Sequence, residues 1–494
     1  MKKLTIFSCL LFVMVIGTAF AQDNPLPFGT AGNNNARTYV YQAPYIFGNG
    51  SNIVVKWQAQ LDVAPLSTRR NAWHNITFDD QGGLYFRGAP NAAVTDYGIH
   101  KLDANTGAKL WYNPAVADVS FHTGAAIVGR DAVYASRYDA ANPTVYALDK
   151  NTGGLLWQSA PLPMPVSLNM NLYDGVLYGI TKRDANGFSH AFSINAATGA
   201  ILQVTPIATT ADIDYGNTAF APNVFGPGEH GIYWFHNDPG TAEAMYGVGI
   251  STTGAFKAWS QTPIRSYPSH PIYNAEMNVV YALHWADYGS AVEAYDPVTG
   301  AKKWIAAPNG DPNLGFPGGF NGGFYPTHTL KPDGTGFIFA GFGGDIYSVT
   351  DPGDLLGAPL TMNANGDWYY DGADYLGESQ TMALTIVDPF TGQWILISGT
   401  SADSTNPHRL YAQDLQTGAR LWEWTDPGDV NPYAGAFNYR ALSIGPNGDL
   451  YYMDANAGPM GTLYCISVVI PEPGTIAMII SGLFGMLLMF RRKK

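Results

Sequence analysis

The sequence predicts an all-β protein, built as an eight-bladed β-propeller of four-stranded blades. Two observations support this prediction: a motif that recurs along the chain, and a composition rich in residues typical of strands and tight turns. The 494 residues include 56 Gly, 30 Tyr and 24 Phe, and only 13% of them are charged. Such a composition favours many short strands joined by tight turns over helices.

The recurring motif consists of an apolar strand, an Asp, a Thr-Gly turn and a second strand that carries Trp. Its clearest copies are residues 99–111, 145–157, 292–304 and 410–422. Self-similarity at a fixed period indicates one supersecondary unit copied around a ring or along a stack. Repeats share one continuous architecture, so the motif overrides the roughly three domains that the length alone would suggest.

Each repeat is expected to hold four strands, which in the first repeat are 75–78, 84–87, 98–102 and 109–112. Strand 53–60 resembles the fourth strand of a repeat, but no other strands precede it. We therefore expect it to pair with the last repeat, which removes two exposed sheet edges and closes the ring. This closure gives eight blades over residues 52–469. Seven blades is the alternative, because the repeat signal is weak over 322–363.

The residues of the motif are expected to have structural roles. Gly supplies a left-handed turn conformation, Asp accepts hydrogen bonds from turn amides, and the flat indole packs between neighbouring blades. The turn glycines are Gly107, Gly153, Gly199, Gly254, Gly300 and Gly418, and the tryptophans are Trp57, Trp111, Trp157, Trp304 and Trp422. The aspartates are expected to be structural rather than catalytic: Asp103, Asp149, Asp296 and Asp414.

The N-terminal end has the features of a secretory signal peptide, residues 1–21. Lys2 and Lys3 precede the apolar run 4–16, and a small-residue cleavage site follows at 19–21. Residues 22–51, rich in Asn, Gly and Tyr, are expected to form a flexible lead rather than a separate domain.

The C-terminal end, residues 470–494, combines Pro471-Glu472-Pro473, the apolar run 476–490 and four basic residues. This tripartite tail resembles the PEP-CTERM sorting signal of Gram-negative bacteria. The resemblance implies recognition by an exosortase, a transient anchor in the inner membrane, and delivery to the outer surface or an extracellular matrix. A plain C-terminal membrane anchor is the alternative, with the basic residues on the cytoplasmic side.

Charge and cysteine content narrow the choice of partners and chemistry. The net charge is −13, and six of the 26 Lys and Arg lie in the two terminal segments, so the region between them is more acidic still. Such a domain repels phosphate backbones, and nucleic acid is not an expected partner. Cys465 is the only cysteine beyond the signal peptide, so no internal disulfide is available and this thiol is expected to be buried and inert.

The repeat Ala-x-Asp-x-x-Thr-Gly-x-x-x-Trp resembles that of the PQQ-like propellers, which include quinoprotein dehydrogenases and the outer-membrane assembly factor BamB. Quinoprotein alcohol dehydrogenases have a vicinal disulfide against the cofactor, a Ca²⁺ or lanthanide ion and a catalytic Asp. The resemblance implies that an enzyme of this kind would carry the same features. This chain has no adjacent cysteines, and 367–374 lacks the spacing of a Ca²⁺ loop. We therefore predict no catalytic residue, metal or cofactor; PQQ with Ca²⁺ is kept as the alternative.

A candidate ligand site comes from aligning the expected inner strands. Each begins with a side chain that can donate a hydrogen bond, and these side chains would form a ring at one mouth of the central channel. Its members are His74, His122, Asn169, Asn217, His270, His328, Gln380 and Arg440. The ring would bind an anion, a sugar or carboxylate, or a metal; the alternative is a polar lining that binds only ordered water.

Two long connections, 307–325 and 355–379, are expected to reach the same mouth. The second contains Trp368 and three tyrosines, which suit stacking on sugar rings but could equally cap the core. The preferred function is a cell-surface or matrix propeller that binds an exopolysaccharide or an envelope protein, in a biofilm or envelope setting. The alternatives are a PQQ-dependent oxidoreductase and a BamB-like scaffold.

Overall fold

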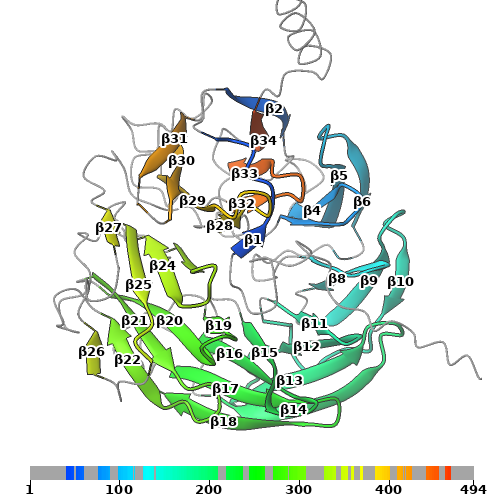
Figure 1. Ribbon diagram of the computed structural model, residues 1–494. Coiled ribbons are helices and arrows are strands. Elements are labelled where there is room, and N and C mark those ends of the chain that lie inside the picture. Colours follow the sequence, from blue (N-terminus) through cyan, green and yellow to red (C-terminus); the bar gives the residue numbers. More distant parts are fainter. Residues whose placement is uncertain are drawn as a thin grey trace, which may run out of the picture.

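The computed structural model is a ring of β-sheets (Figure 1). It describes residues 40–48, 52–60, 76–88, 98–114, 116, 126–137, 141–167, 169–209, 218–236, 244–261, 271–286, 289–306, 327–340, 346–353, 358–360, 368–370, 384–400, 409–415, 417, 419–425, 441–454 and 462–468. These residues form eight sheets and no helix, so the eight-bladed propeller is confirmed and the seven-bladed alternative is wrong. Over these ranges, a helix long and apolar enough to span a membrane is therefore absent as well.

The first four blades each consist of four consecutive antiparallel strands. Blade 1 contains β3 (Thr77–Phe78), β4 (Gly83–Gly88), β5 (Gly98–Asp103) and β6 (Lys109–Asn113). Blade 2 contains β7 (Ile127–Val128), β8 (Ala132–Arg137), β9 (Thr144–Asp149) and β10 (Leu155–Gln158). Blade 3 contains β11 (Asn171–Tyr173), β12 (Val176–Ile180), β13 (Phe188–Asn195) and β14 (Ile201–Ala208). Blade 4 contains β15 (Ala219–Gly226), β16 (Glu229–His236), β17 (Ala244–Ile250) and β18 (Ala255–Gln261).

The next three blades follow the same order, and two of them gain a strand. Blade 5 contains β19 (Ile272–Asn274), β20 (Val279–Ala286), β21 (Gly289–Tyr295) and β22 (Lys302–Ala306), with β26 (Ala358–Leu360) added in parallel to β22. Blade 6 contains β23 (Thr327–Leu330), β24 (Gly336–Ala340), β25 (Ile346–Thr350) and β27 (Trp368–Tyr370). Blade 7 contains β28 (Leu384–Val387), β29 (Trp394–Thr400), β30 (Arg409–Asp414) and β31 (Arg420–Thr425), with β1 (Val40–Gln42) added in parallel to β28.

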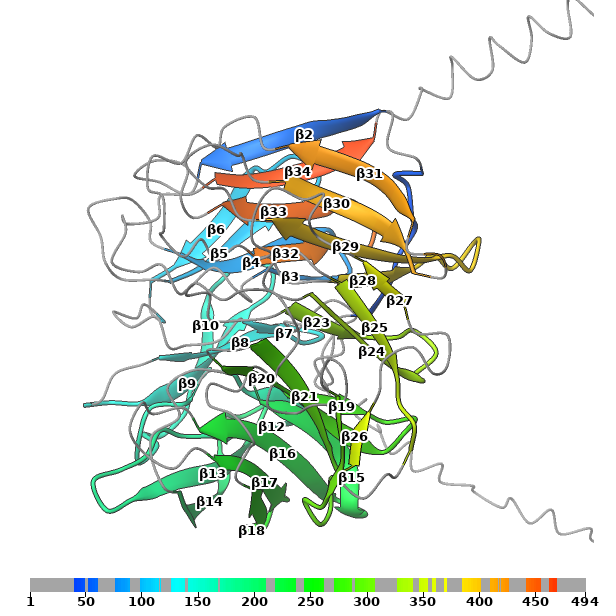
Figure 2. The same ribbon diagram turned by 90° about the vertical axis from the view of Figure 1, so that its left-hand side faces the viewer.

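Blade 8 joins the two ends of the domain and confirms the expected ring closure. Three of its strands are β32 (Ala441–Ile444), β33 (Leu450–Asp454) and β34 (Thr462–Val468), and the fourth is β2 (Ile53–Gln60). Figure 2 shows β2 lying along β34, with which it pairs in an antiparallel register from Ile53–Val468 to Gln60–Thr462. Both strands thereby lose a free edge.

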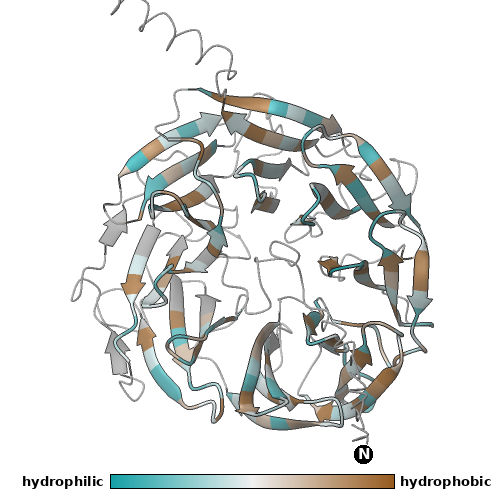
Figure 3. Cartoon of the chain, turned by 45° about the vertical axis from the view of Figure 1, so that its right-hand side comes forward, coloured by the Kyte–Doolittle hydropathy of each residue, from teal (hydrophilic) through white to brown (hydrophobic). Residues whose placement is uncertain are grey.

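Apolar side chains fill the spaces between neighbouring blades. One cluster joins blades 7, 8 and 1, and separate clusters join blades 1 and 2, 2 and 3, 3 and 4, 4 and 5, and 5 and 6. Apolar and polar residues alternate along many of the strands, as Figure 3 shows for the outer strands of the ring. In β31 this alternation buries Trp422 and Trp424, whereas Glu423 is half-buried and Thr425 is exposed. The burial period of two is that of a strand with one face toward the core.

The tryptophan of one blade packs under the turn of the next blade. The indole nitrogens of Trp57, Trp111 and Trp157 donate hydrogen bonds of 2.9, 3.3 and 2.9 Å to backbone oxygens of blades 1, 2 and 3, respectively. The acceptors are the residues that directly follow the motif Asp or its Asn counterpart, namely Ala104, Lys150 and Ala196. We call this residue the docking position.

Glycine is required in these turns because the indole lies directly below it. Gly107 has φ +72°, and a Cβ atom placed on it would lie 2.6 Å from Cε3 of Trp57. Gly153 and Gly199 have the same conformation and the same close contact with Trp111 and Trp157. A side chain here would therefore meet backbone strain and steric overlap with the indole together.

Blade 4 departs from the expected turn pattern. Gly254, aligned with the turn glycines in the sequence, does not have a positive φ, and the turn there is shorter, with a hydrogen bond of 2.9 Å from Ser251 N to Gly254 O. Trp259, five rather than four residues after this glycine, packs against Gly300 and donates to Pro297 O at 3.0 Å. The fixed spacing used to find the tryptophans therefore missed this one.

Blade 8 cannot supply the usual docking turn. Its last two strands, β34 and β2, come from opposite ends of the domain, so no turn joins them. The N-terminal segment takes its place: Trp422 of blade 7 donates to the Tyr45 hydroxyl at 3.0 Å, and its ring packs on Phe47 with centroids 5.3 Å apart. Tyr41 and Phe47 are buried in the same cluster. Residues 40–48 are thus packed rather than flexible; residues 22–39 and 49–51 of the expected lead lie outside the described ranges, as does Gly418.

We predict that Trp57→Ala lowers the free energy of unfolding by about 3–5 kcal/mol, because it leaves a cavity below Gly107 and removes the bond to Ala104. Leu156→Ala is the control, since Leu156 lies on an outer strand and is 52% exposed, and it should change stability by less than ~0.5 kcal/mol. Equilibrium unfolding in guanidinium measures both. Similar losses for the two variants would contradict the role assigned to the indole.

Candidate functional site

The predicted ring at the channel mouth lies mostly outside the described residues. Asn169 lies two residues before β11, the first strand of blade 3, and His328 is the second residue of β23, the first strand of blade 6. The other six positions are not described: His74, His122, Asn217, His270, Gln380 and Arg440. The convergence of the eight side chains therefore stays a prediction.

Asn169 forms part of a polar contact between the first strands of blades 3 and 4. It is buried, and its backbone oxygen accepts a hydrogen bond from the hydroxyl of Thr218 at 3.4 Å. The Asn171 side chain donates to the same hydroxyl at 3.2 Å. The alignment of strand starts did not identify Asn171 or Thr218, because both lie next to the aligned positions rather than at them.

At blade 7 the strand nearest the axis comes from the N-terminal segment. The sheet order is β1-β28-β29-β30-β31, so β1 lies inside β28, the strand at whose start Gln380 was expected (Figure 1). Gln42 of β1 is exposed, whereas Tyr41 is buried. Alignment of the repeats could not predict β1 as a strand of blade 7, because residues 22–51 carry no repeat.

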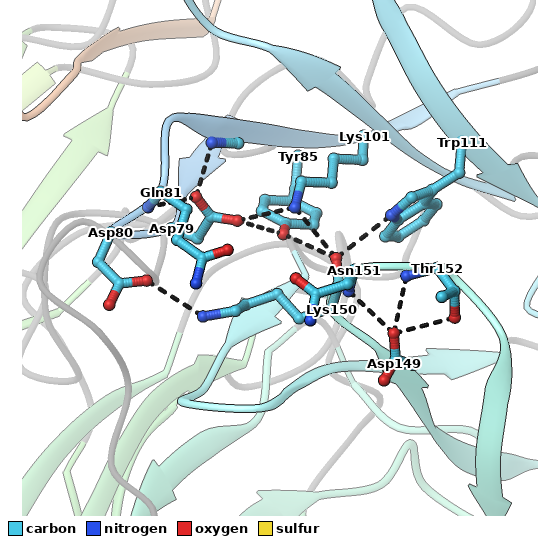
Figure 4. A network of polar contacts seen from close by, with 11 residues as sticks. Asp79, Asp80, Gln81, Tyr85, Lys101, Trp111, Asp149, Lys150, Asn151 and Thr152 are labelled. Carbon is cyan, nitrogen blue, oxygen red and sulfur yellow. Dashed lines mark hydrogen bonds and ion pairs between the residues drawn. The ribbon is translucent and has the colours of Figure 1, made fainter.

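The polar network at the junction of blades 1 and 2 is centred on the buried carboxylate of Asp79 (Figure 4). This carboxylate accepts hydrogen bonds from the Tyr85 hydroxyl at 2.6 Å and from the amides of Gln81 and Gly83 at 2.8 and 2.6 Å. It also forms an ion pair of 3.0 Å with the buried Lys101. Burial opposes ionisation of Asp79, but these bonds outweigh it and lower the pKa of the carboxyl.

The same network reaches into blade 2 through one backbone oxygen. Lys150 O accepts from Lys101 Nζ at 3.1 Å and from the Trp111 indole at 3.3 Å (Figure 4). The Tyr85 hydroxyl oxygen, whose hydrogen is donated to Asp79, also lies 3.3 Å from Lys150 O. The Lys150 side chain forms an ion pair of 3.1 Å with the exposed Asp80. Burial, followed by the bond to Asp79, raises the pKa of Tyr85, so this hydroxyl stays a donor.

A related arrangement lies within blade 8. Asp449 is buried, pairs with Lys56 at 2.9 Å and accepts a hydrogen bond from the hydroxyl of Ser467. Cys465 stands on β34 close to this carboxylate. Burial, with the adjacent charge of Asp449, raises the pKa of its thiol to about 12, so at neutral pH the thiol is protonated and a poor nucleophile.

The aspartates of the motif hold the turns together. Asp103 Oδ1 accepts from the amides of Asn105 and Thr106 at 2.8 and 2.9 Å, and Asp149 and Asp296 make the corresponding bonds in blades 2 and 5. In blade 6 a carboxylate at the docking position replaces the backbone oxygen: Asp351 accepts from the Trp304 indole at 2.9 Å and from the Tyr281 hydroxyl at 2.6 Å. These carboxylates are occupied by structural bonds.

Among the residues with described positions, no three His, Cys, Asp or Glu side chains lie close enough to hold a metal ion. The neutral amides and hydroxyls near the axis, such as those of Asn171 and Thr218, suit hydrogen bonding rather than tight binding of an ion. Asn169, Asn171 and Thr218 therefore form a buried, uncharged polar contact between blades 3 and 4.

Comparison with known proteins supports the fold. Residues 95–210 match the family model described as outer membrane protein assembly factor BamB. The sequence matches no curated protein. Among solved structures, two quinohemoprotein alcohol dehydrogenases, from Pseudomonas putida HK5 and Comamonas testosteroni, each superpose with a TM-score of 0.54 at 13% identity. The matches cover 91% and 90% of this chain and 82% and 81% of the two enzymes.

A europium-containing methanol dehydrogenase has a TM-score of 0.51 at 12% identity, with 89% of this chain and 98% of the enzyme covered. At this level of identity the similarity shows a shared β-propeller fold and carries no activity with it.

We predict that Asp79→Asn lowers the free energy of unfolding at pH 7 by about 3–5 kcal/mol, because it leaves the buried Lys101 ammonium without its counter-charge. The folded pKa of Asp79 is lowered, so its stabilisation is complete above the ordinary carboxyl pKa and is lost as the pH falls through the folded value. The wild type should therefore lose stability more steeply than the variant below about pH 4.

The control for this experiment is Asp131→Asn, because Asp131 is an exposed carboxylate that directly precedes β8. Its free energy of unfolding in urea should equal that of the wild type at neutral pH and should fall with pH in the same way. An Asp79→Asn variant as stable as the control would show that the Asp79–Lys101 pair contributes nothing to the junction.

Proposed function

We propose that the protein is an exported binding or scaffold module of the cell surface or extracellular matrix, and that it recognises an exopolysaccharide or an envelope protein. The observation that carries this proposal is how the carboxylates are used. Asp79, Asp351 and Asp449 bind tyrosine, tryptophan, serine or lysine side chains, and the motif aspartates bind turn amides. A propeller in which these acids are committed to its own structure suits binding better than acid–base catalysis.

The proposed location rests on the two ends of the sequence, which lie outside the described residues. The secretory signal at 1–21 would direct export, and the PEP-CTERM-like tail at 470–494 would be recognised by an exosortase after a transient stay in the inner membrane. We further propose that the bound polysaccharide is neutral or carries amino groups, because the acidic net charge of −13 repels anionic polymers.

The second candidate is a PQQ-dependent oxidoreductase, favoured by the fold shared with the quinoprotein dehydrogenases. The residues of this chain fit that cofactor poorly. Its two cysteines are residues 9 and 465, so the vicinal pair implied by the resemblance cannot form. A buried cation could pair with an anionic cofactor, but the guanidinium of the buried Arg87 already donates to the backbone oxygens of Val116 and Ser136 at 3.0 and 2.8 Å. A BamB-like scaffold agrees with the match over 95–210, but the sorting tail argues against it.

We expect the purified protein to bind neutral or amino-sugar polymers on a glycan array, and the double variant His122→Ala/His270→Ala to bind them at least tenfold more weakly. Both histidines belong to the predicted ring at the channel mouth. His190→Ala is the matched control, since His190 lies on β13, the third strand of blade 3, away from the axis. Binding that is equal for all three proteins would place the glycan site elsewhere.

The rival activity is tested by adding PQQ and Ca²⁺ to the purified protein and following dye-linked oxidation of alcohols. We expect no activity and no change in the absorbance spectrum of PQQ. Turnover that requires both additions would overturn the proposal of a binding module.

A further inference from the structure

The junction between blades 6 and 7 differs from the others in what fills it. Apolar clusters span the other junctions, but none of the clusters formed by described residues joins blade 6 to blade 7. Leu396 of blade 7 and Ile338 of blade 6 are each 1% exposed, yet neither belongs to a cluster. We call the described part of this junction the polar seam.

The strand register identifies the residues of blade 7 that face the polar seam. Gln413 pairs with Leu396, which in turn pairs with Thr385, so the three lie on one face of the blade. The Thr385 hydroxyl accepts a hydrogen bond of 3.2 Å from Thr329 of blade 6, which shows that this face is toward blade 6. Tyr411 and Ser398 form the adjacent pair of the same face.

Gln413 is an exception to the repeat. It occupies the position immediately before the motif Asp, where blades 1, 2 and 3 carry Leu102, Leu148 and Ile194. Each of these three is buried in an apolar cluster shared with the preceding blade. A polar amide in the corresponding place removes apolar contact from the seam and introduces hydrogen-bonding groups instead.

The amide of Gln413 is buried without a partner. The residue is 0% exposed, and neither Oε1 nor Nε2 forms a hydrogen bond. The Ser398 hydroxyl, also 0% exposed, has none either. Because unpaired buried polar groups are costly and rare, two such residues on one face indicate that a further molecule completes their bonds.

We propose that blades 6 and 7 enclose a binding site for hydroxyl groups, in which oxygen atoms that both donate and accept hydrogen bonds pair with Gln413 and Ser398. A primary amide offers two donors and an acceptor, and a serine hydroxyl offers one donor and an acceptor, so a neutral O–H group satisfies both. The oxygen atoms come from ordered water or from the hydroxyls of a saccharide.

Charge does not select the ligand of the polar seam. Glu423 lies beside Tyr411 in the register, but its carboxylate is paired with Arg409 at 3.0 Å and with Arg420 at 2.8 Å. The deeper residues Thr385, Ser398 and Gln413 are uncharged. The site is thus suited to neutral hydroxyl groups rather than to anions or metal ions. It rests on these buried groups alone and stands independently of the proposed ring at the channel mouth.

Crystal structures of the protein, grown with and without the neutral disaccharide cellobiose, test the proposal and separate the two sources. Oxygen density within hydrogen-bond distance of the Gln413 amide in both crystals supports water as the ligand. Sugar density that replaces it in the second crystal supports a saccharide. A seam without bound oxygen atoms, in which the Gln413 amide bonds to protein groups, overturns the proposal.

Two variants provide a second measurement. Gln413→Leu gives blade 7 the residue that blades 1 and 2 carry, and we expect it to remove the bound oxygen atoms while the thermal midpoint stays the same or rises. Leu148→Gln is the matched reciprocal control, which buries an amide in an apolar junction and should lower the midpoint. A Gln413→Leu variant that keeps the bound oxygen atoms would refute the site; should it fail to fold, Ser398→Ala is measured in the same way.

Discussion

The structure depends on one interaction between neighbouring blades: an indole of one blade packs beneath a left-handed glycine of the next and donates to a backbone oxygen beside it. Trp57, Trp111, Trp157 and Trp259 all make this contact. A four-stranded sheet buries little surface on its own, so the contact with its neighbour supplies much of the stability of each blade. The hydrogen bond fixes the position of the ring against the turn, and the glycine allows the close approach.

Where this interaction cannot form, the chain uses a substitute. At blade 6 a side-chain carboxylate, that of Asp351, replaces the backbone oxygen and accepts from both an indole and a tyrosine. At blade 8 the turn is missing, because β34 and β2 come from opposite ends of the domain, and Tyr45 and Phe47 contact Trp422 instead. The N-terminal segment also supplies β1 to blade 7, so it stabilises the ring at the point where continuity of the chain cannot.

The sequence was sufficient to predict the fold and insufficient to predict the site. The motif repeats because every junction has the same physical requirements, and therefore the strand order, the blade count and the closure by 53–60 could all be read from it. Tyr45, Trp259 and Asp351 could not, because each meets the same requirement with a different residue or spacing. The functional surface is harder still, since a ligand imposes no period on the sequence and Gln413 is conspicuous only against Leu102, Leu148 and Ile194 in the structure.

The pairing of β2 with β34 also determines the order of events when the protein is made. Ile53 and Val468 are neighbours in the last sheet, although more than four hundred residues separate them along the chain. The first outer strand to be synthesised must therefore wait, with its edge unprotected, until nearly the whole polypeptide has been made. During this delay the unpaired edge of β2 is the part of the chain that a chaperone would have to protect.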